Sequence, residues 1–171
     1  MAILEILTAP DPRLYEKAHP VEKVDRTVRK LMDDLLETMY SNDGIGLASV
    51  QAGIHKRVIV VDLGERNGIP FKPLLMADPE LQWVSSQTQT TQEGCLSVPR
   101  FYEKVVRPLE AHISYLDENN KKQHLKTQGL LADCLQHEMD HLNGILFIDY
   151  LSSLKRTMIL RKLIKAKKTQ R

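Results

Sequence analysis

The sequence has few cysteines, few aromatic residues and no long apolar run. Two cysteines occur among 171 residues, so a disulfide framework of the kind that stabilises small secreted domains is not expected. No apolar run reaches the roughly 20 residues that a bilayer-spanning helix needs. Residues 1–10 lack a basic leader, and Glu5 interrupts their apolar stretch, so they do not read as a secretory signal. These absences predict a cytoplasmic protein without a membrane partner.

The rest of the composition is that of an ordinary globular chain. Apolar residues make up 42% and charged residues 27% of the sequence, which argues against a disordered or fibrous protein. A chain of this length can bury roughly 70% of the surface that its unfolded form exposes. No repeat, linker or low-complexity segment divides it. We therefore expect residues 1–171 to form a single domain, and the protein to be a monomer.

Charge is unevenly distributed along the chain. The net charge is +2, yet residues 151–171 hold eight Lys and Arg and no acid, which leaves 16 of the 24 basic residues against all 22 acids upstream, a formal charge of −6. This segment predicts a basic C-terminal helix, with Leu160, Leu163 and Ile164 packed on the body. Such a helix can bind nucleic acid. A solvated helix face is an equally good interpretation.

Patterns of apolar residues and of capping or turn residues predict helices at both ends and strands in the middle. The predicted helices run from Asp11 to near Pro20, from the cap Asp25 through Met39, from about Thr127 to Asn143 with Gly144 ending the helix, and onward from Ser152. The predicted strands are Val58–Leu63, Leu81–Val84, Ala111–Leu116 and Lys121–Leu125. Strands without regular alternation with helices favour an α+β fold, with antiparallel or mixed sheets.

The predicted helix from Thr127 contains an HExxH motif, His137-Glu138-Met139-Asp140-His141. Residues four apart lie about 6 Å from each other along one helix face, so two imidazoles can converge on one metal ion. Glu138 then lies beside the ion, where it can exchange protons with a metal-bound water as a general base. The alternative is a chance HExxH in a charged helix.

A catalytic site of this kind needs a third protein ligand and an open position for water. In the extended protease motif HExxHxxGxxH, the third histidine would be at the position that Phe147 occupies here. The only acid after His141 is Asp149. Cys134 lies about 10.5 Å from His141 along the helix axis, too far for a short thiol. Cys95, in a glycine- and proline-flanked segment, is the better candidate, although a lone cysteine is more often a small core residue. Both Cys95 and Asp149 remain open on these grounds.

Three segments together resemble the signature motifs of peptide deformylases. In chain order they are Gly44-Ile45-Gly46-Leu47-Ala48-Ser49-Val50-Gln51, Glu93-Gly94-Cys95-Leu96-Ser97-Val98-Pro99 and the HExxH helix. The resemblance extends over nearly the whole chain, and three motifs in register are far more specific than HExxH alone. It implies an α+β fold packed around the HExxH helix. It also implies an enzyme that removes the formyl group from the N-terminal methionine of new polypeptides.

The resemblance implies a role for each matching residue. Cys95, His137 and His141 match the ligands of one divalent metal ion, Glu138 matches the general base, and Gln51 and the backbone N–H of Leu96 match the donors that stabilise the negative oxygen. The resemblance implies Fe²⁺ in the cell, while Zn²⁺, Ni²⁺ or Co²⁺ also suits the ligands in purified protein. Formate and a free N-terminal methionine are the implied products.

The resemblance also implies how the peptide binds. Substrates of the family, N-formylmethionyl peptides, lie extended along the backbones of Gly44, Ile45 and Gly46 and of Gly94 to Leu96, because glycine lets two chains approach closely. The implied walls of the methionine pocket are Ile45, Leu130 and Cys134. Plain core packing is the alternative for these walls. New polypeptides emerge from ribosomes, so the basic C-terminal helix is a candidate ribosome-binding element.

Two other functions are compatible with parts of the pattern. One is an HExxH endopeptidase with Asp149 as third ligand, which would cleave unformylated peptides internally. The other is a structural zinc module that binds RNA through the basic tail. A structural site needs a fourth ligand, for which the sequence offers no convincing residue.

Overall fold

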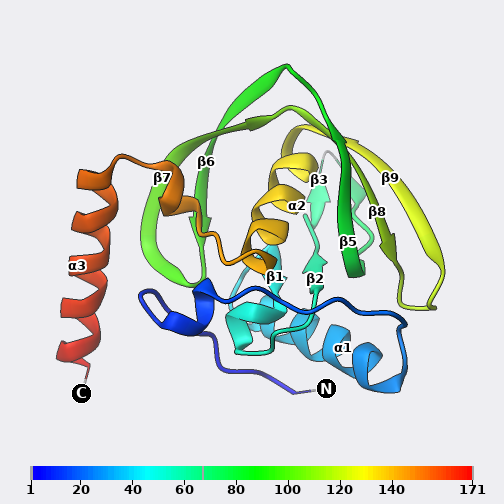
Figure 1. Cartoon of the computed structure of the whole chain (residues 1–171), viewed down its shortest axis with the longest axis horizontal. Helices are drawn as coiled ribbons and strands as arrows, with labels where there is room; N and C mark the ends of the chain where they lie inside the picture. Colours follow the sequence, from blue (N-terminus) through cyan, green and yellow to red (C-terminus); the bar gives the residue numbers. More distant parts are fainter. Residues whose placement is uncertain (1, 67, 171) are drawn as a thin grey trace.

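The computed structural model of the chain describes residues 2–66 and 68–170 (Figure 1). Its helices are the 3-10 helices η1 (Pro12–Tyr15), η2 (Ser49–Ala52) and η3 (Phe147–Tyr150) and the α-helices α1 (Arg26–Ser41), α2 (Gly129–Leu142) and α3 (Ser153–Thr169). Its strands are β1 (Gly46–Ala48), β2 (Val58–Val61), β3 (Glu65–Arg66), β4 (Ile69–Pro70), β5 (Leu74–Val84), β6 (Thr88–Cys95), β7 (Val98–Pro108), β8 (Glu110–Leu116) and β9 (Lys122–Gln128).

Antiparallel pairing builds every sheet in the described part of the chain. The main sheet has five strands in the order β1-β2-β5-β8-β9, while β6 pairs with β7 and β3 with β4 as separate hairpins. Figure 1 shows α2 between the β6–β7 hairpin and the main sheet, with α3 at the outer edge. This arrangement confirms the predicted α+β fold around the HExxH helix. No helix within residues 2–66 and 68–170 has the length and apolar character that crossing a membrane requires.

The amphipathic pattern of α1 attaches this helix to the main sheet. The Asp25 carboxylate accepts a hydrogen bond from the Val28 N–H at 2.9 Å, so Asp25 caps the helix as predicted. Met32, Leu35 and Met39 are fully buried and pack in one cluster with residues of β1 and β2. Burial of each such side chain contributes about 1.5–3 kcal/mol. This packing fixes β1, which borders the cavity described below.

The central helix α2 begins after Gln128, and the predicted cap on Thr127 is wrong. Thr127 pairs with Ala111 as part of β9, so the sheet holds this residue and the strand runs directly into the helix. At the other end Gly144 has φ 75°, as predicted for the residue that ends the helix. The carbonyl of Tyr15 lies so close to Gly144 that a side chain there would overlap it. The end of α2 is therefore packed against the N-terminal segment.

Neither β6 nor β7 is predicted as a strand, because β6 is largely polar and the apolar residues of β7 do not alternate regularly with polar ones. The register of the β6–β7 hairpin shifts between Glu93 and Cys95, so Cys95 lies at an irregular strand end beside the turn. Val98 and Val105 attach the hairpin to a buried cluster that includes Phe147 of η3. The hairpin is thus a second, separately folded wall that faces α2.

Two further elements differ in length from their predictions. The first helix is a single 3-10 turn that ends at Tyr15. β5 has 11 residues and continues upstream of the predicted segment 81–84. Pro79 interrupts the sequence pattern of this strand, but the register shifts between Ala77 and Glu80, and this irregularity accommodates the proline.

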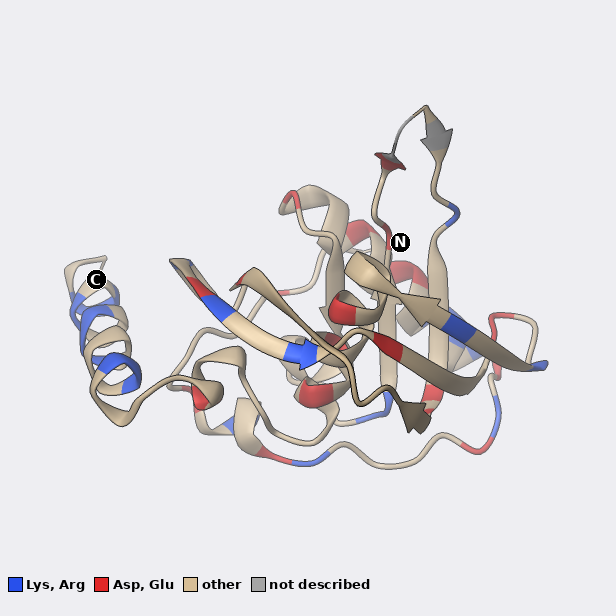
Figure 2. Cartoon of the chain, turned by 90° about the horizontal axis from the view of Figure 1, so that it is seen from above, with Lys and Arg blue, Asp and Glu red and all other residues tan. Residues whose placement is uncertain are grey.

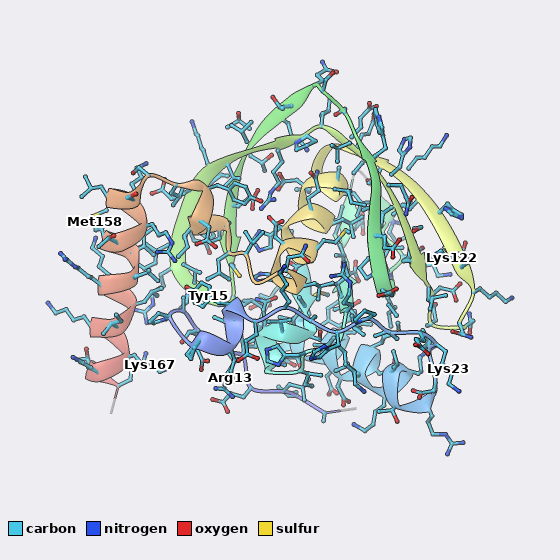
Figure 3. All side chains as sticks on the ribbon, in the orientation of Figure 1. Arg13, Tyr15, Lys23, Lys122, Met158 and Lys167 are labelled. Carbon is cyan, nitrogen blue, oxygen red and sulfur yellow. The ribbon has the colours of Figure 1, made fainter. Side chains whose placement is uncertain are left out.

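The last helix, α3, contacts the body through a narrow apolar stripe and through the ion pairs of Lys155 with Glu103 and of Arg156 with Asp149. Ile159 and Leu163 are buried in the same cluster as the hairpin residues. Ile164 is 40% exposed, so the prediction that it packs on the body is wrong. Lys and Arg cover much of the rest of α3 (Figure 2). Met158 lies near its start and Lys167 near its end (Figure 3), and both are exposed.

Candidate active site and metal centre

α2 and the β6–β7 hairpin bring the predicted ligands together. The Sγ of Cys95 and one ring nitrogen each of His137 and His141 all lie within 4.8 Å of one another. The Sγ of Cys95 is 3.4 Å from Nε2 of His141. A thiolate and two imidazoles form a donor set that suits a divalent ion and leaves a coordination position open. These three residues therefore fit a metal ion, whose identity the donor set does not select.

The alternative ligands lie outside this cluster. Asp149 accepts hydrogen bonds from the Leu146 N–H at 2.9 Å and from Arg156 at 2.8 Å, and it serves the end of η3. Cys134 is buried on α2 and is not among the clustered donors. The cluster has three members among the residues that the structure describes. Neither the endopeptidase with Asp149 as ligand nor a closed four-ligand site is supported.

A buried ionic network orients His137. Its Nδ1 lies 2.8 Å from Oε1 of Glu93, which also binds Arg107 through two hydrogen bonds of 2.6 and 2.9 Å. Arg107 donates a third bond to Asp140 at 2.8 Å. Burial alone would raise the pKa of Glu93, but hydrogen bonds from His137 and Arg107 lower it to about 2. A charged Glu93 fixes the ring of His137 with its other nitrogen directed at the metal position.

η3 closes this network from the other side. The hydroxyl of Tyr150 donates to Oδ2 of Asp140 at 2.7 Å, and the guanidinium of Arg107 lies 5.0 Å from the centre of the Tyr150 ring. Arg107 itself is 4% exposed. One buried cation therefore connects β6, α2 and η3.

Sequence reasoning does not identify Glu93, Arg107 or Ser97, although Glu93 and Ser97 lie within the second motif. The available signal is an acid on a largely polar strand and an arginine on a strand of mixed residues. That signal is weak, because charged residues on strands usually face solvent. Only the pairing of β6 with β7 and the position of α2 show that Glu93 and Arg107 point inward.

Glu138 lies between the two histidine ligands in sequence and is 5% exposed. Its Oε2 is buried and has no hydrogen-bond partner among the described residues. Burial raises the pKa of Glu138 to about 7, although the charges of His137 and Arg107 oppose the increase. A Cβ on Gly46 would lie 2.5 Å from Oε1 of Glu138, so the glycine makes room for this carboxyl group.

Gln51, on η2, reaches Cys95 of the metal cluster. Its Oε1 accepts from the Ala48 N–H at 2.9 Å, which fixes the orientation of the amide. Its Nε2 donates to Ser97 Oγ at 3.0 Å and lies 3.4 Å from Sγ of Cys95. The amide group is thus held beside the metal position with its donor side inward.

A cavity of about 810 Å³ opens onto this cluster. Every residue predicted for the site lines it, except His141, which is 1% exposed. The backbones of β1 and β6 form two of its edges. A Cβ on Gly94 would lie 2.5 Å from the Tyr102 ring, so the hairpin edge requires glycine there. Ile45 and Leu130, at 42% and 37% exposed, are accessible rather than core residues.

A Cys-His-His donor set at the wall of a cavity, with a buried carboxyl group beside it on the HExxH helix, defines a metal-dependent hydrolase of the HExxH class. A family model described as "Polypeptide deformylase" matches residues 3–157. The peptide deformylase of Stutzerimonas stutzeri (strain A1501) is 52% identical over 170 residues, covering 99% of each chain. The crystal structure of peptide deformylase from Ehrlichia chaffeensis has a TM-score of 0.95 to this chain at 42% identity, covering 99% of each chain.

A further relative belongs to the same family. The curated peptide deformylase of Methylocella silvestris is 49% identical over 170 residues, with 98% of this chain and 87% of the relative covered. The chain belongs to the polypeptide deformylase family, and it is an enzyme with peptide deformylase activity. The resemblance seen in the three sequence motifs is thereby confirmed.

Proposed function

We propose that the chain hydrolyses N-formylmethionyl peptides to formate and a free N-terminal methionine, with Glu138 moving the proton. The observation that carries this proposal is the buried, unpartnered carboxyl oxygen of Glu138, which faces a cavity beside the Cys95, His137 and His141 donor set. A divalent ion held by these three residues would supply Lewis-acid activation of water and of the formyl oxygen. The protein supplies position, proton transfer and hydrogen-bond donors.

Glu138 acts first as base and then as acid. Its carboxylate accepts a proton from the attacking water, and the same carboxyl group then donates a proton to the departing amine nitrogen. A group that both takes and gives a proton near neutral pH works best when its pKa is near 7. Burial places the pKa of Glu138 at about 7.

Gln51 and the backbone N–H of Leu96 stabilise the oxygen that becomes negative during attack. Both hydrogens of the Gln51 amide have acceptors, Ser97 Oγ at 3.0 Å and Cys95 Sγ at 3.4 Å. Sulfur is the weaker acceptor. The N–H directed at Cys95 is therefore the one that exchanges its sulfur acceptor for the substrate oxygen as hydrogen-bond partner, while the hydrogen bond to Ser97 keeps the amide in place.

The peptide lies extended between β1 and the β6 end of the hairpin. Gly44, Gly46 and Gly94 let its backbone approach these edges. Ile45, Leu130 and Cys134 form the walls around the first side chain. Their shared position on the 810 Å³ cavity supports this assignment.

The test of this function is formate release. Formyl-Met-Ala-Ser is expected to yield formate and Met-Ala-Ser, and unformylated Met-Ala-Ser is expected to remain intact. Formate is measured with a coupled dehydrogenase and the peptides by mass spectrometry. Internal cleavage of the unformylated peptide, without formate release from the formylated one, would instead indicate an endopeptidase.

We also propose the cellular setting of the enzyme. It is a cytoplasmic monomer of one domain over residues 1–171, and it uses Fe²⁺ in the cell. Zn²⁺, Ni²⁺ or Co²⁺ occupies the same ligands in purified protein, because thiolate and imidazole accept all of these ions. Metal analysis of protein purified with and without oxygen tests the choice of ion.

Ribosome binding through α3 is a separate proposal. The side chains of Lys162, Lys165 and Lys168 are exposed and available to bind phosphate groups, and Lys167 is exposed on the side of α3 near Asp11. Deletion of residues 165–171 is expected to weaken cosedimentation with ribosomes at low salt and to spare hydrolysis of formyl-Met-Ala-Ser. Binding of the intact chain should fall steeply as salt rises.

A charge variant provides the matched control for this deletion. Replacing Lys165, Lys167 and Lys168 by glutamine keeps the helix length and removes only charge, so it should weaken cosedimentation as the deletion does. Salt-insensitive cosedimentation that neither change reduces would show that the end of α3 is only a solvated helix face.

A further inference from the structure

The cavity contains a buried carboxyl group that the reaction does not use. Asp133 lines the cavity and is 3% exposed, and its Oδ1 has no hydrogen-bond partner within the described ranges. The nearest cation is Arg107, whose Nε lies 3.9 Å away, too far for a hydrogen bond. Arg107 is already bonded to Glu93 and Asp140. The guanidinium therefore does not need Asp133 as a hydrogen-bond partner.

Asp133 lies where the first side chain of a bound peptide would end. It shares one face of α2 with Leu130, Cys134 and His137, all of which line the cavity. It is one helical turn from His137, about 6 Å along the axis. An unbranched side chain of methionine length extends about 5 Å. If the formyl group is at the metal position, as the proposed function requires, such a side chain reaches Asp133.

The Asp133 carboxyl group changes which terminal groups of a substrate side chain the pocket favours. A substrate side chain with a purely apolar end would leave Oδ1 of Asp133 buried without a hydrogen-bond partner, which is unfavourable. A primary amide carries both donors and an acceptor, so it can pair with a carboxyl group in either protonation state. Burial, the charge of the Glu93 carboxylate and a hydrogen bond shared with Glu93 raise the pKa of Asp133 to about 6, while the charges of Arg107 and His137 oppose the increase. An amide partner is therefore suitable over the whole neutral range.

We propose that Asp133 is a specificity-determining residue, and that through it the pocket accepts formylated first residues whose unbranched side chain ends in a hydrogen-bonding group, as glutamine does. Thr91 supports a polar pocket from the opposite wall, because it lines the same cavity from β6. Methionine, with a weakly accepting sulfur, is accepted, and its all-carbon isostere norleucine is disfavoured relative to a purely apolar pocket. This inference rests on the proposed function.

The test compares kcat/KM for formyl-Gln-Ala-Ser and formyl-norleucine-Ala-Ser on each metal-loaded enzyme. The ratio of the two values cancels any loss of active protein. Asp133→Leu and Asp133→Ala are expected to lower the glutamine-to-norleucine ratio at least about tenfold. Asp133→Asn, which keeps hydrogen bonding, should retain most of the ratio. Two apolar variants are used so that a folding defect of the larger leucine leaves the alanine to be measured.

The matched control is Asp140→Asn, which perturbs Arg107 from a position that does not line the cavity. Its ratio should equal that of the unmodified enzyme. An unchanged ratio in both apolar variants, or an equal fall in Asp140→Asn, would overturn the assignment of Asp133. Absence of formate from formyl-Met-Ala-Ser with the unmodified enzyme would instead overturn the proposed function, and the inference with it.

Discussion

Replacing Glu138 by glutamine is expected to leave the bound metal in place and to slow formate release at least about 10²-fold. The substitution preserves the shape of a side chain that is 5% exposed and that fits against Gly46. It leaves all three ligands untouched. An amide cannot accept the proton of the attacking water, so only proton transfer is removed.

Two measurements separate this effect from damage to the site. Metal content is determined for each purified protein, and kcat is measured with formyl-Met-Ala-Ser. Glu80→Gln, on an exposed residue of β5, is the matched change in side-chain chemistry and should have normal kcat. Near-normal turnover by a metal-loaded Glu138→Gln enzyme would refute the assignment of Glu138 as the proton carrier.

Cys95→Ala is expected to lose the metal and the activity together, whereas Cys134→Ala should keep a full complement of metal. Removing residues that only orient a ligand costs about 10–100-fold in metal affinity. Removing a ligand itself should lower the metal affinity by more than about 100-fold, because only the two histidines on α2 would still bind the ion. The thiol of Cys134 belongs to α2 and is not among the clustered donors.

Metal analysis and circular dichroism of both variants decide this prediction. The far-ultraviolet spectrum should match that of the unmodified protein, because Cys95 lies at a strand end and contributes little to the core. A folded Cys95→Ala protein that retains stoichiometric metal would remove the basis of the proposed site.

Elements with a periodic apolar pattern could be predicted from the sequence, and those without one could not. α1 combines a recurring apolar face with the cap Asp25, and both signals agree with the structure. β6 consists largely of threonine and glutamine, and the apolar residues of β7 do not alternate regularly with polar ones. Their place in the fold depends on pairing with each other and on the cluster around Phe147. Such long-range contacts leave no local trace in sequence.

The same distinction holds within the site. Spacing along one helix places His137 and His141 on one face, and the family motifs supply Cys95 and Gln51. The distance between Cys95 and the histidines depends on how the hairpin docks on α2, which no spacing rule predicts. Asp133 is the clearest omission, since the sequence shows an acid one turn before His137 on the same helix face. The sequence does not show that Asp133 is buried, or that its Oδ1 has no partner in the described structure.

The network centred on Arg107 restricts how this chain can diverge in evolution. Breaking a buried ion pair by removing one member costs about 3–5 kcal/mol, because the other charge remains buried and unpaired. Arg107 binds Glu93 and Asp140 at once, and Glu93 in turn orients a histidine of the cluster. A single substitution at any of these positions is therefore expected to lower the stability of the fold strongly. Lineages that lose Arg107 are expected to have replaced its acidic partners Glu93 and Asp140 as well. The residues at these three positions should therefore change together.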